Sequence, residues 1–231
     1  MSYVLPPPPQ AKLPVAGSDA FFPVRRIFCV GRNYEAHARE MGNDPDREPP
    51  FFFTKPADAA IATPCTLPYP SLTEDLHHEI ELVIAIGKGG ADIPASRVHE
   101  HIWGASVGID FTRRDLQAAA KDARRPWDWS KAFDNSAPIA PIVPMADVAS
   151  LSDARIWLAV NGETRQDANI ADLIWSVDEH IATLSEGMTL APGDLIMTGT
   201  PAGVAACQTG DVLTGGVDGI ATLEVTIGPR A

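Results

Sequence analysis

The sequence predicts one globular domain that combines β-strands with a few helices and follows a proline-rich arm. Its 231 residues are enough to bury one large core. Short runs of apolar, β-branched residues that end in glycine or a charged residue indicate strands, as at 79–87 and 102–109. Capping residues and amphipathic stripes indicate helices, as at 34–41. We assign residues 1–23 to the arm, where frequent proline excludes a regular helix, and residues 24–231 to the domain.

The elements between these landmarks follow from caps and turns. Asn33 can cap the first helix, and Ser176 with Glu179 forms a capping box for the last helix. The dipeptide Asn161-Gly162 is typical of a tight hairpin turn. In chain order, we expect strand 24–30, helix 34–41, a mobile turn-rich loop at 42–50, strands 51–53, 79–87 and 102–109, helix 113–124, hairpin 156–165, helix 176–187, strand 195–197, a glycine-rich loop at 198–204 and hairpin 210–228.

Composition disfavours several classes of partner. The formal net charge of −12, without a basic patch, argues against nucleic acid and anionic membrane surfaces. The three cysteines, Cys29, Cys65 and Cys207, are widely spaced and are typical of free thiols in a reducing compartment. No stretch reaches the roughly 18 apolar residues of a membrane span. We therefore expect a cytoplasmic protein whose partner is neither nucleic acid nor a membrane.

Acidic residues at the start of the 79–87 strand indicate a candidate metal site. Side chains alternate between the faces of a strand, so Glu79 and Glu81 share one face. Two buried carboxylates repel each other, and a hard cation such as Mg²⁺, Mn²⁺ or Ca²⁺ would relieve that repulsion. Asp110, at the end of the 102–109 strand, can supply a third ligand. The alternative interpretation is an ordinary solvated strand face.

Three further positions carry candidate chemistry, each with a simpler alternative. His37 lies on the inward-facing stripe of the first helix, and Glu40 is one turn away, so the pair can act as a general base or be a surface ion pair. Lys55 ends an aromatic strand and can hold a substrate carboxylate or extend along the surface. Lys131 lies among aromatic residues and can stabilise developing negative charge or make a surface cation–π contact.

Five segments, taken together and in this order, resemble the fumarylacetoacetate hydrolase family. They are residues 30–37 (VGRNYEAH), 78–82 (HEIEL), 108–115 (GIDFTRRD), 130–134 (SKAFD) and 198–204 (TGTPAGV). Within the family, residues 41–45 and 48–53 are most similar to enzymes that act on fumarylpyruvate. The match covers nearly all of the chain from about residue 25 to residue 227.

The resemblance implies the fold class and the roles of ten residues. The expected fold is α+β, a mixed β-sandwich roll with peripheral helices, in a homodimer. The family's Mg²⁺ or Mn²⁺ ligands correspond to Glu79, Glu81 and Asp110, and its water-activating pair, on a lid helix near 33–42, corresponds to His37 and Glu40. The remaining catalytic and substrate-binding positions correspond to Lys131, Thr200, Arg114, Gln117 and Lys55.

The implied activity is metal-dependent hydrolysis of the C3–C4 bond of 2,4-dioxo acids (acylpyruvates), with fumarylpyruvate of gentisate-type aromatic degradation as substrate. The products would be fumarate and pyruvate. Oxaloacetate decarboxylation is the alternative reaction, followed by hydratase or isomerase activity and by a non-catalytic binding protein on the same fold. A fumaryl tail needs a cation for its distal carboxylate, and Arg32, Arg39, Lys55 and Arg114 are equal candidates. Residue types do not distinguish Mg²⁺ from Mn²⁺ or a fumaryl from a maleyl group.

Overall fold

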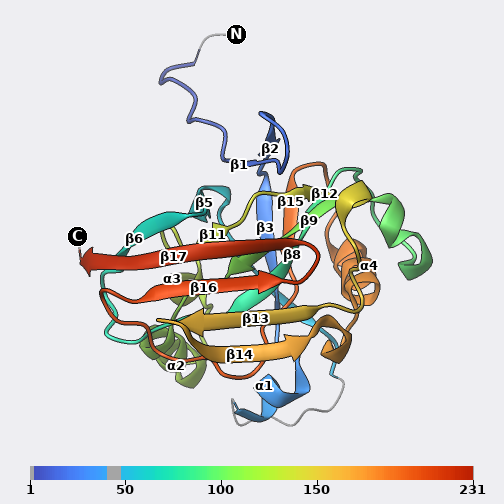
Figure 1. Ribbon diagram of the computed structural model, residues 1–231. Helices are drawn as coiled ribbons and strands as arrows, with labels where there is room; N and C mark the ends of the chain where they lie inside the picture. Colours follow the sequence, from blue (N-terminus) through green and yellow to red (C-terminus); the bar gives the residue numbers. More distant parts are fainter. Residues whose placement is uncertain (1–2, 41–47, 231) are drawn as a thin grey trace.

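Two mixed β-sheets, packed face to face, form the body of the protein in the computed structural model, which describes residues 3–40 and 48–230 (Figure 1). In this part of the chain the larger sheet has eight strands, in the order β4 (Phe51–Lys55), β3 (Arg26–Gly31), β15 (Asp194–Met197), β8 (Ile80–Ile86), β9 (Ile102–Ile109), β11 (Ala137–Ile139) and β5 (Ala60–Ala62), with β12 (Val143–Pro144) beside β9. The smaller sheet has five described strands, β14 (Glu163–Asn169), β13 (Arg155–Val160), β16 (Val212–Val217), β17 (Ala221–Arg230) and β6 (Cys65–Tyr69).

Short strand pairs and peripheral helices complete the fold. The strand pairs are β1 (Lys12–Pro14) with β2 (Phe21–Pro23), and β7 (Leu76–His77) with β10 (Thr112–Arg113). The α-helices are α1 (Glu35–Glu40), α2 (Arg114–Asp122), α3 (Asp128–Lys131) and α4 (Val177–Gly187). Sheets that mix parallel pairs, such as β3 with β15, and antiparallel pairs, such as β8 with β9, confirm the predicted α+β class. Among the described residues, no helix is both long and apolar enough to cross a membrane.

The central strand β8 is buried on both faces, which explains its continuous apolar run. Leu82 and Ile84 point into the core between the two sheets, where they join Leu213 of the opposite sheet. Val83 and Ala85 point to the other face, into a second core cluster. Because the period of a strand is two residues, Glu79 and Glu81 lie on the same face as Val83. The acidic residues therefore lie on the outer face of the larger sheet, away from the main core.

Predicted turns and caps agree with the structure where they depend on local chemistry. Asn161 and Gly162, with φ of 52° and 81°, form the turn between β13 and β14, as the positive-φ preference of Asn-Gly predicts. The Ser176–Glu179 capping box starts α4.

The expectation that Asn33 caps the first helix is wrong. Its side chain donates to the carbonyls of Trp175 and Thr198 and accepts from the Trp175 amide, so it ties the β3–α1 connection to two distant segments. The predicted end of that helix at Met41–Gly42 and most of the predicted loop at 42–50 lie outside the described residues.

The proline-rich arm is partly integrated into the domain. Strands β1 and β2 pair with each other, and Leu13 is fully buried in the second core cluster. Residues 3–10 extend away from the body (Figure 1). The boundary at residue 23 stays a prediction.

Candidate active site

Three carboxylates meet where β8 begins and β9 ends. The two strands are antiparallel, and the Asp110 amide donates to the Glu79 carbonyl at 2.8 Å, so Asp110 faces the acidic pair across the strands. Glu79, Glu81 and Asp110, hereafter the acidic triad, are 5 %, 1 % and 0 % exposed. Each offers an oxygen within 4.8 Å of the others. This is a buried cluster, so a solvated strand face no longer describes these residues.

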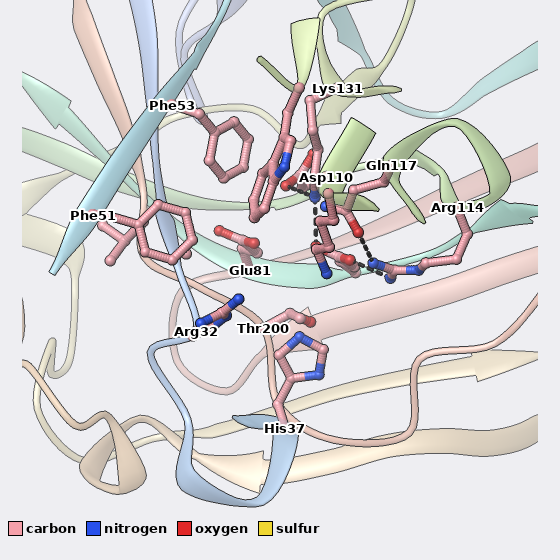
Figure 2. Close-up of a pocket in the computed structure, with 15 residues that line it drawn as sticks. Arg32, His37, Phe51, Phe53, Glu81, Asp110, Arg114, Gln117, Lys131 and Thr200 are labelled. Carbon is pink, nitrogen blue, oxygen red and sulfur yellow. Dashed lines mark hydrogen bonds and ion pairs between the residues drawn. The ribbon is translucent and has the colours of Figure 1, made fainter. Parts of the chain in front are cut away.

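Three cations, hereafter the inner cations, surround the acidic triad, and Figure 2 shows two of them, Lys131 and Arg114. Lys131 Nζ lies 2.7 Å from Glu79 Oε2 and 2.5 Å from Asp110 Oδ2. Arg114 donates from Nη2 to Glu79 Oε1, and Lys55 Nζ lies 2.8 Å from Asp110 Oδ1. The triad and the inner cations therefore balance in formal charge.

Glu81 differs from the other two acids. Its Oε2 accepts the Gly199 amide at 2.7 Å, and no cation pairs with it among the described residues. Burial, together with the charges of Asp110 and Glu79, raises the pKa of Glu81 well above its usual range. For Glu79, burial opposes ionisation, but the charges of Lys131 and Arg114 outweigh it and lower the pKa.

The donor set fits a hard divalent cation. Asp110 Oδ1 is buried and within ion-pair distance of Lys55, yet it accepts no hydrogen bond. Carboxylate oxygens converging at this spacing, without histidine or cysteine among them, are the ligands preferred by Mg²⁺ and Mn²⁺. A cation would also remove the repulsion that disfavours ionised Glu81.

His37, on α1, faces the same pocket from the opposite side, and Glu40 lies behind it on the same helix. His37 is 6 % exposed, and its Nδ1 lies 3.3 Å from Glu40 Oε2. Glu40 in turn accepts the Gly203 amide at 3.1 Å. Gly203 has φ of 97°, and a Cβ there would lie 1.9 Å from the Arg165 carbonyl oxygen, so only glycine allows this close approach. Burial lowers the pKa of His37, although the Glu79 and Glu40 charges act against this shift.

A hollow of about 400 Å³, including its open mouth, joins these groups. Figure 2 shows His37 and Thr200 on one side of this hollow and the inner cations Lys131 and Arg114 on the other. The predicted site residues on its wall are His37, Glu79, Glu81, Asp110, Arg114, Gln117, Lys131 and Thr200. Gln117 accepts from Arg114 Nη1 at 2.7 Å, and Thr200 Oγ1 accepts from Gln166 Nε2 at 2.8 Å.

Lys55 is placed differently from its expected role. Its side chain is fully buried, it is absent from the pocket wall, and its Nζ donates to the carbonyls of Phe111 and Lys131. The ammonium lies behind Asp110 and bonds to acceptors of the protein, and a substrate contact for Lys55 stays a prediction.

The family model for the fumarylacetoacetate (FAA) hydrolase C-terminal domain matches residues 26–228. The chain belongs to the fumarylacetoacetate hydrolase family. The predicted resemblance is thereby confirmed, and the two packed mixed sheets are the fold of this family.

Individual family members are similar over most of the chain. Fumarylpyruvate hydrolase of Ralstonia sp. is 45 % identical over 191 residues, which is 82 % of this chain and 99 % of that protein. The crystal structure of fumarylpyruvate hydrolase from Pseudomonas aeruginosa, in complex with Mn²⁺ and pyruvate, superposes with a TM-score of 0.97 at 51 % identity and covers 99 % of this chain and 100 % of that one. A mitochondrial oxaloacetate tautomerase of Arabidopsis thaliana is 40 % identical over 205 residues, covering 89 % of this chain and 92 % of that protein.

Two residues at this site carry no signal in the sequence that would have identified them. Gln166, on β14, is fully buried, and it bonds to His78, to the Ile80 amide, to Thr200 and to the Pro201 carbonyl. It therefore connects the strand of the acidic triad to the glycine-rich loop. Lys121 lies in the last turn of α2 and lines the pocket. Both are polar residues in polar segments, and only tertiary packing distinguishes them from surface residues.

Proposed function

We propose that the protein is a metal-dependent hydrolase that cleaves the C3–C4 bond of 2,4-dioxo acids, with fumarylpyruvate of gentisate-type aromatic degradation as substrate. The observation that carries the proposal is that one pocket is lined by the buried acidic triad and by His37, whose Nδ1 is paired with Glu40. The similarity to fumarylpyruvate hydrolases supports the choice of fumarylpyruvate as the substrate. Pyruvate, held in the Pseudomonas structure, is one of the two expected products.

Glu79, Glu81 and Asp110 would hold the ion, Mg²⁺ or Mn²⁺. When bound, a divalent ion supplies Lewis-acid polarisation and stabilises developing negative charge on oxygen. Arg114, Gln117 and Thr200 line the wall beside the triad and would orient the substrate there. Lys55 would act behind Asp110, where its charge holds that carboxylate in place.

His37 would activate the attacking water. If Nδ1 carries its proton toward Glu40, Nε2 is free to accept a proton from water. Burial lowers the pKa of His37, which keeps the imidazole neutral and able to act as a base near pH 7. Glu40, held by the Gly203 amide, would fix the ring orientation and stabilise the imidazolium that forms.

The reaction needs only the 2,4-dioxo acid and one water molecule as reactants. The water oxygen adds to the C4 carbonyl, the C3–C4 bond breaks, and its electron pair passes to the three-carbon fragment. Lys131, with its ammonium on the pocket wall, would stabilise that negative charge. Protonation at C3 then gives pyruvate, and the acyl part leaves as a carboxylate.

The test is product analysis with and without metal. Purified protein with Mn²⁺ should consume fumarylpyruvate and release pyruvate and fumarate in equal amounts, and EDTA should abolish both. If the protein with Mn²⁺ converts no 2,4-dioxo acid, the proposal fails. The lid role of α1, the homodimer and the cytoplasmic location stay predictions.

A second candidate substrate is oxaloacetate, because a relative that is 40 % identical acts on it. Neither decarboxylation nor enol–keto exchange of oxaloacetate needs a water nucleophile. His37→Ala separates the two candidates: oxaloacetate turnover that survives this change, without acylpyruvate cleavage in the wild type, would favour oxaloacetate.

A further inference from the structure

Two cations remain on the pocket wall after the inner cations are assigned. The acidic triad and the inner cations balance in formal charge. Arg32 and Lys121 line the same pocket, and neither forms an ion pair with any residue in the part of the chain that the structure describes. Two positive charges at the pocket therefore lack an anionic counterpart among the described residues.

The backbone before Arg32 directs it into the pocket. Arg32 has φ of 56°, a left-handed conformation that is uncommon for residues with a side chain and that clusters at ligand sites. A Cβ on the preceding Gly31 would lie 2.0 Å from Phe51 Cζ, so glycine allows the ring to pack against the turn. Figure 2 shows Arg32 beside Phe51, across the pocket from Arg114.

Lys121 approaches the same region from α2. Its Nζ lies 5.3 Å from the centroid of the Trp127 ring. Burial lowers the pKa of Lys121, and the charges of Arg114 and Arg32 lower it further. Arg32 and Lys121, hereafter the outer cations, line the same pocket, and an anion bound there would offset the positive charge of both.

Other candidate cations are already engaged. Arg39 is 59 % exposed and pairs with Glu35 on the surface of α1. Lys55 is buried behind Asp110, and Arg114 is bonded to Glu79 and Gln117. Of the four cations that the sequence offers equally for a distal carboxylate, the structure thus favours Arg32.

We propose that Arg32 and Lys121 bind a second carboxylate at the far end of the acyl group, and so select dicarboxylic 2,4-dioxo acids over monocarboxylic ones. Arg32 lies 5.6 Å from the ring centroid of Phe51, and Lys121 lies 5.3 Å from that of Trp127. These two rings, packed edge to face at 5.3 Å, give the pocket wall an apolar surface that suits a flat, unsaturated linker. This inference rests on the proposed function and adds the residues that determine its specificity.

The test compares substrates that share the acylpyruvate core and differ in the acyl group or in its distal carboxylate. The value of kcat/KM is measured with Mn²⁺ for fumarylpyruvate, for its distal methyl ester and for acetylpyruvate, in the wild type, Arg32→Met and Lys121→Met. Arg39→Met is the matched control, because it removes the same charge from a nearby surface position. Circular dichroism and thermal melting establish that each variant is folded.

We expect each pocket variant to lower the ratio of kcat/KM for fumarylpyruvate over acetylpyruvate by about 10- to 100-fold, since a hydrogen bond to a charged group is lost. The methyl ester should behave like acetylpyruvate, and Arg39→Met should keep the wild-type ratio. Equal losses on all three substrates would overturn the inference, because the cations would then bind the shared 1-carboxylate. An unchanged ratio in both pocket variants would also overturn it while leaving the proposed function intact. Absence of turnover of every substrate in the wild type would instead refute the proposed function, and this inference with it.

Discussion

Replacing Lys131 by methionine should destabilise the metal-free protein far more than the metal-loaded protein. Lys131 is 2 % exposed, and its ammonium contacts Glu79 at 2.7 Å and Asp110 at 2.5 Å. Methionine preserves most of the side-chain volume, so the change removes the charge with little effect on packing. The metal-free variant keeps three buried carboxylates with one cation fewer.

The expected magnitude follows from the burial of the pair. Removing one partner of a buried ion pair costs about 3–5 kcal/mol, because the other charge stays buried without compensation. For a domain of this size, each kcal/mol lowers Tm by roughly 2–4 °C, so the metal-free variant should melt about 6–20 °C below the wild type. Bound Mn²⁺ neutralises the same carboxylates, and most of this difference should then disappear.

Thermal melting in EDTA and in saturating Mn²⁺ measures this effect. Lys88→Met is the matched control, because Lys88 is 57 % exposed and pairs with Glu100 at 3.4 Å on the surface. The control should melt close to the wild type in both conditions. A Lys131→Met protein that melts equally far below the wild type with and without Mn²⁺ would refute the reasoning that links this lysine to a metal-binding triad.

Three further predictions concern the base, its titration and the buried amide. His37→Ala should bind Mn²⁺ as the wild type does and lose at least about 100-fold in kcat for fumarylpyruvate, and retained hydrolysis would exclude His37 as the base. Because burial lowers the pKa of His37 and the neutral ring is the active form, kcat/KM should fall with decreasing pH along a limb centred below 6.5; a limb centred above that value would contradict the assignment. Gln166→Leu should lower the free energy of unfolding by about 2 kcal/mol or more, because the Ile80 amide and the Pro201 carbonyl lose buried partners. Urea titration beside the exposed control Gln208→Leu checks this, and equal stability of the two variants would count against it.

The residues of the acidic triad could be found from the sequence because their placement depends on local rules. The alternation along β8 puts Glu79 and Glu81 on one face, and the strand end at Ile109 puts Asp110 beside them. Likewise, the Asn161-Gly162 turn and the Ser176 cap depend on neighbouring residues alone.

Residues whose roles depend on distant contacts could not be placed from the sequence. Lys55 is an ordinary strand end until Asp110 and Phe111 enclose it from segments more than 50 residues away. Gln166 belongs to a polar strand, and its burial depends on the packing of β14 beneath the glycine-rich loop. Asn33 does not act as the expected helix cap, because its side chain forms three hydrogen bonds with residues that lie far along the chain.

Some strands that contain proline could not be predicted from the sequence either. Proline disfavours a central strand, so the proline-rich sequence at 1–23 indicated no pairing. In the structure β1 and β2 form a two-stranded sheet, and β6, which contains Pro68, lies at the edge of its sheet. Both positions tolerate a residue without an amide donor.

The most direct test of the account is to follow the rate of fumarylpyruvate cleavage as Mn²⁺ is titrated into metal-free protein, with bound Mn²⁺ measured in the same samples by electron paramagnetic resonance. If the acidic triad holds the ion on which hydrolysis depends, the rate should start near zero and rise in proportion to bound Mn²⁺ until each chain holds one ion. Glu81→Gln should weaken binding and rate together. A full rate in the metal-free wild type would contradict the central claim.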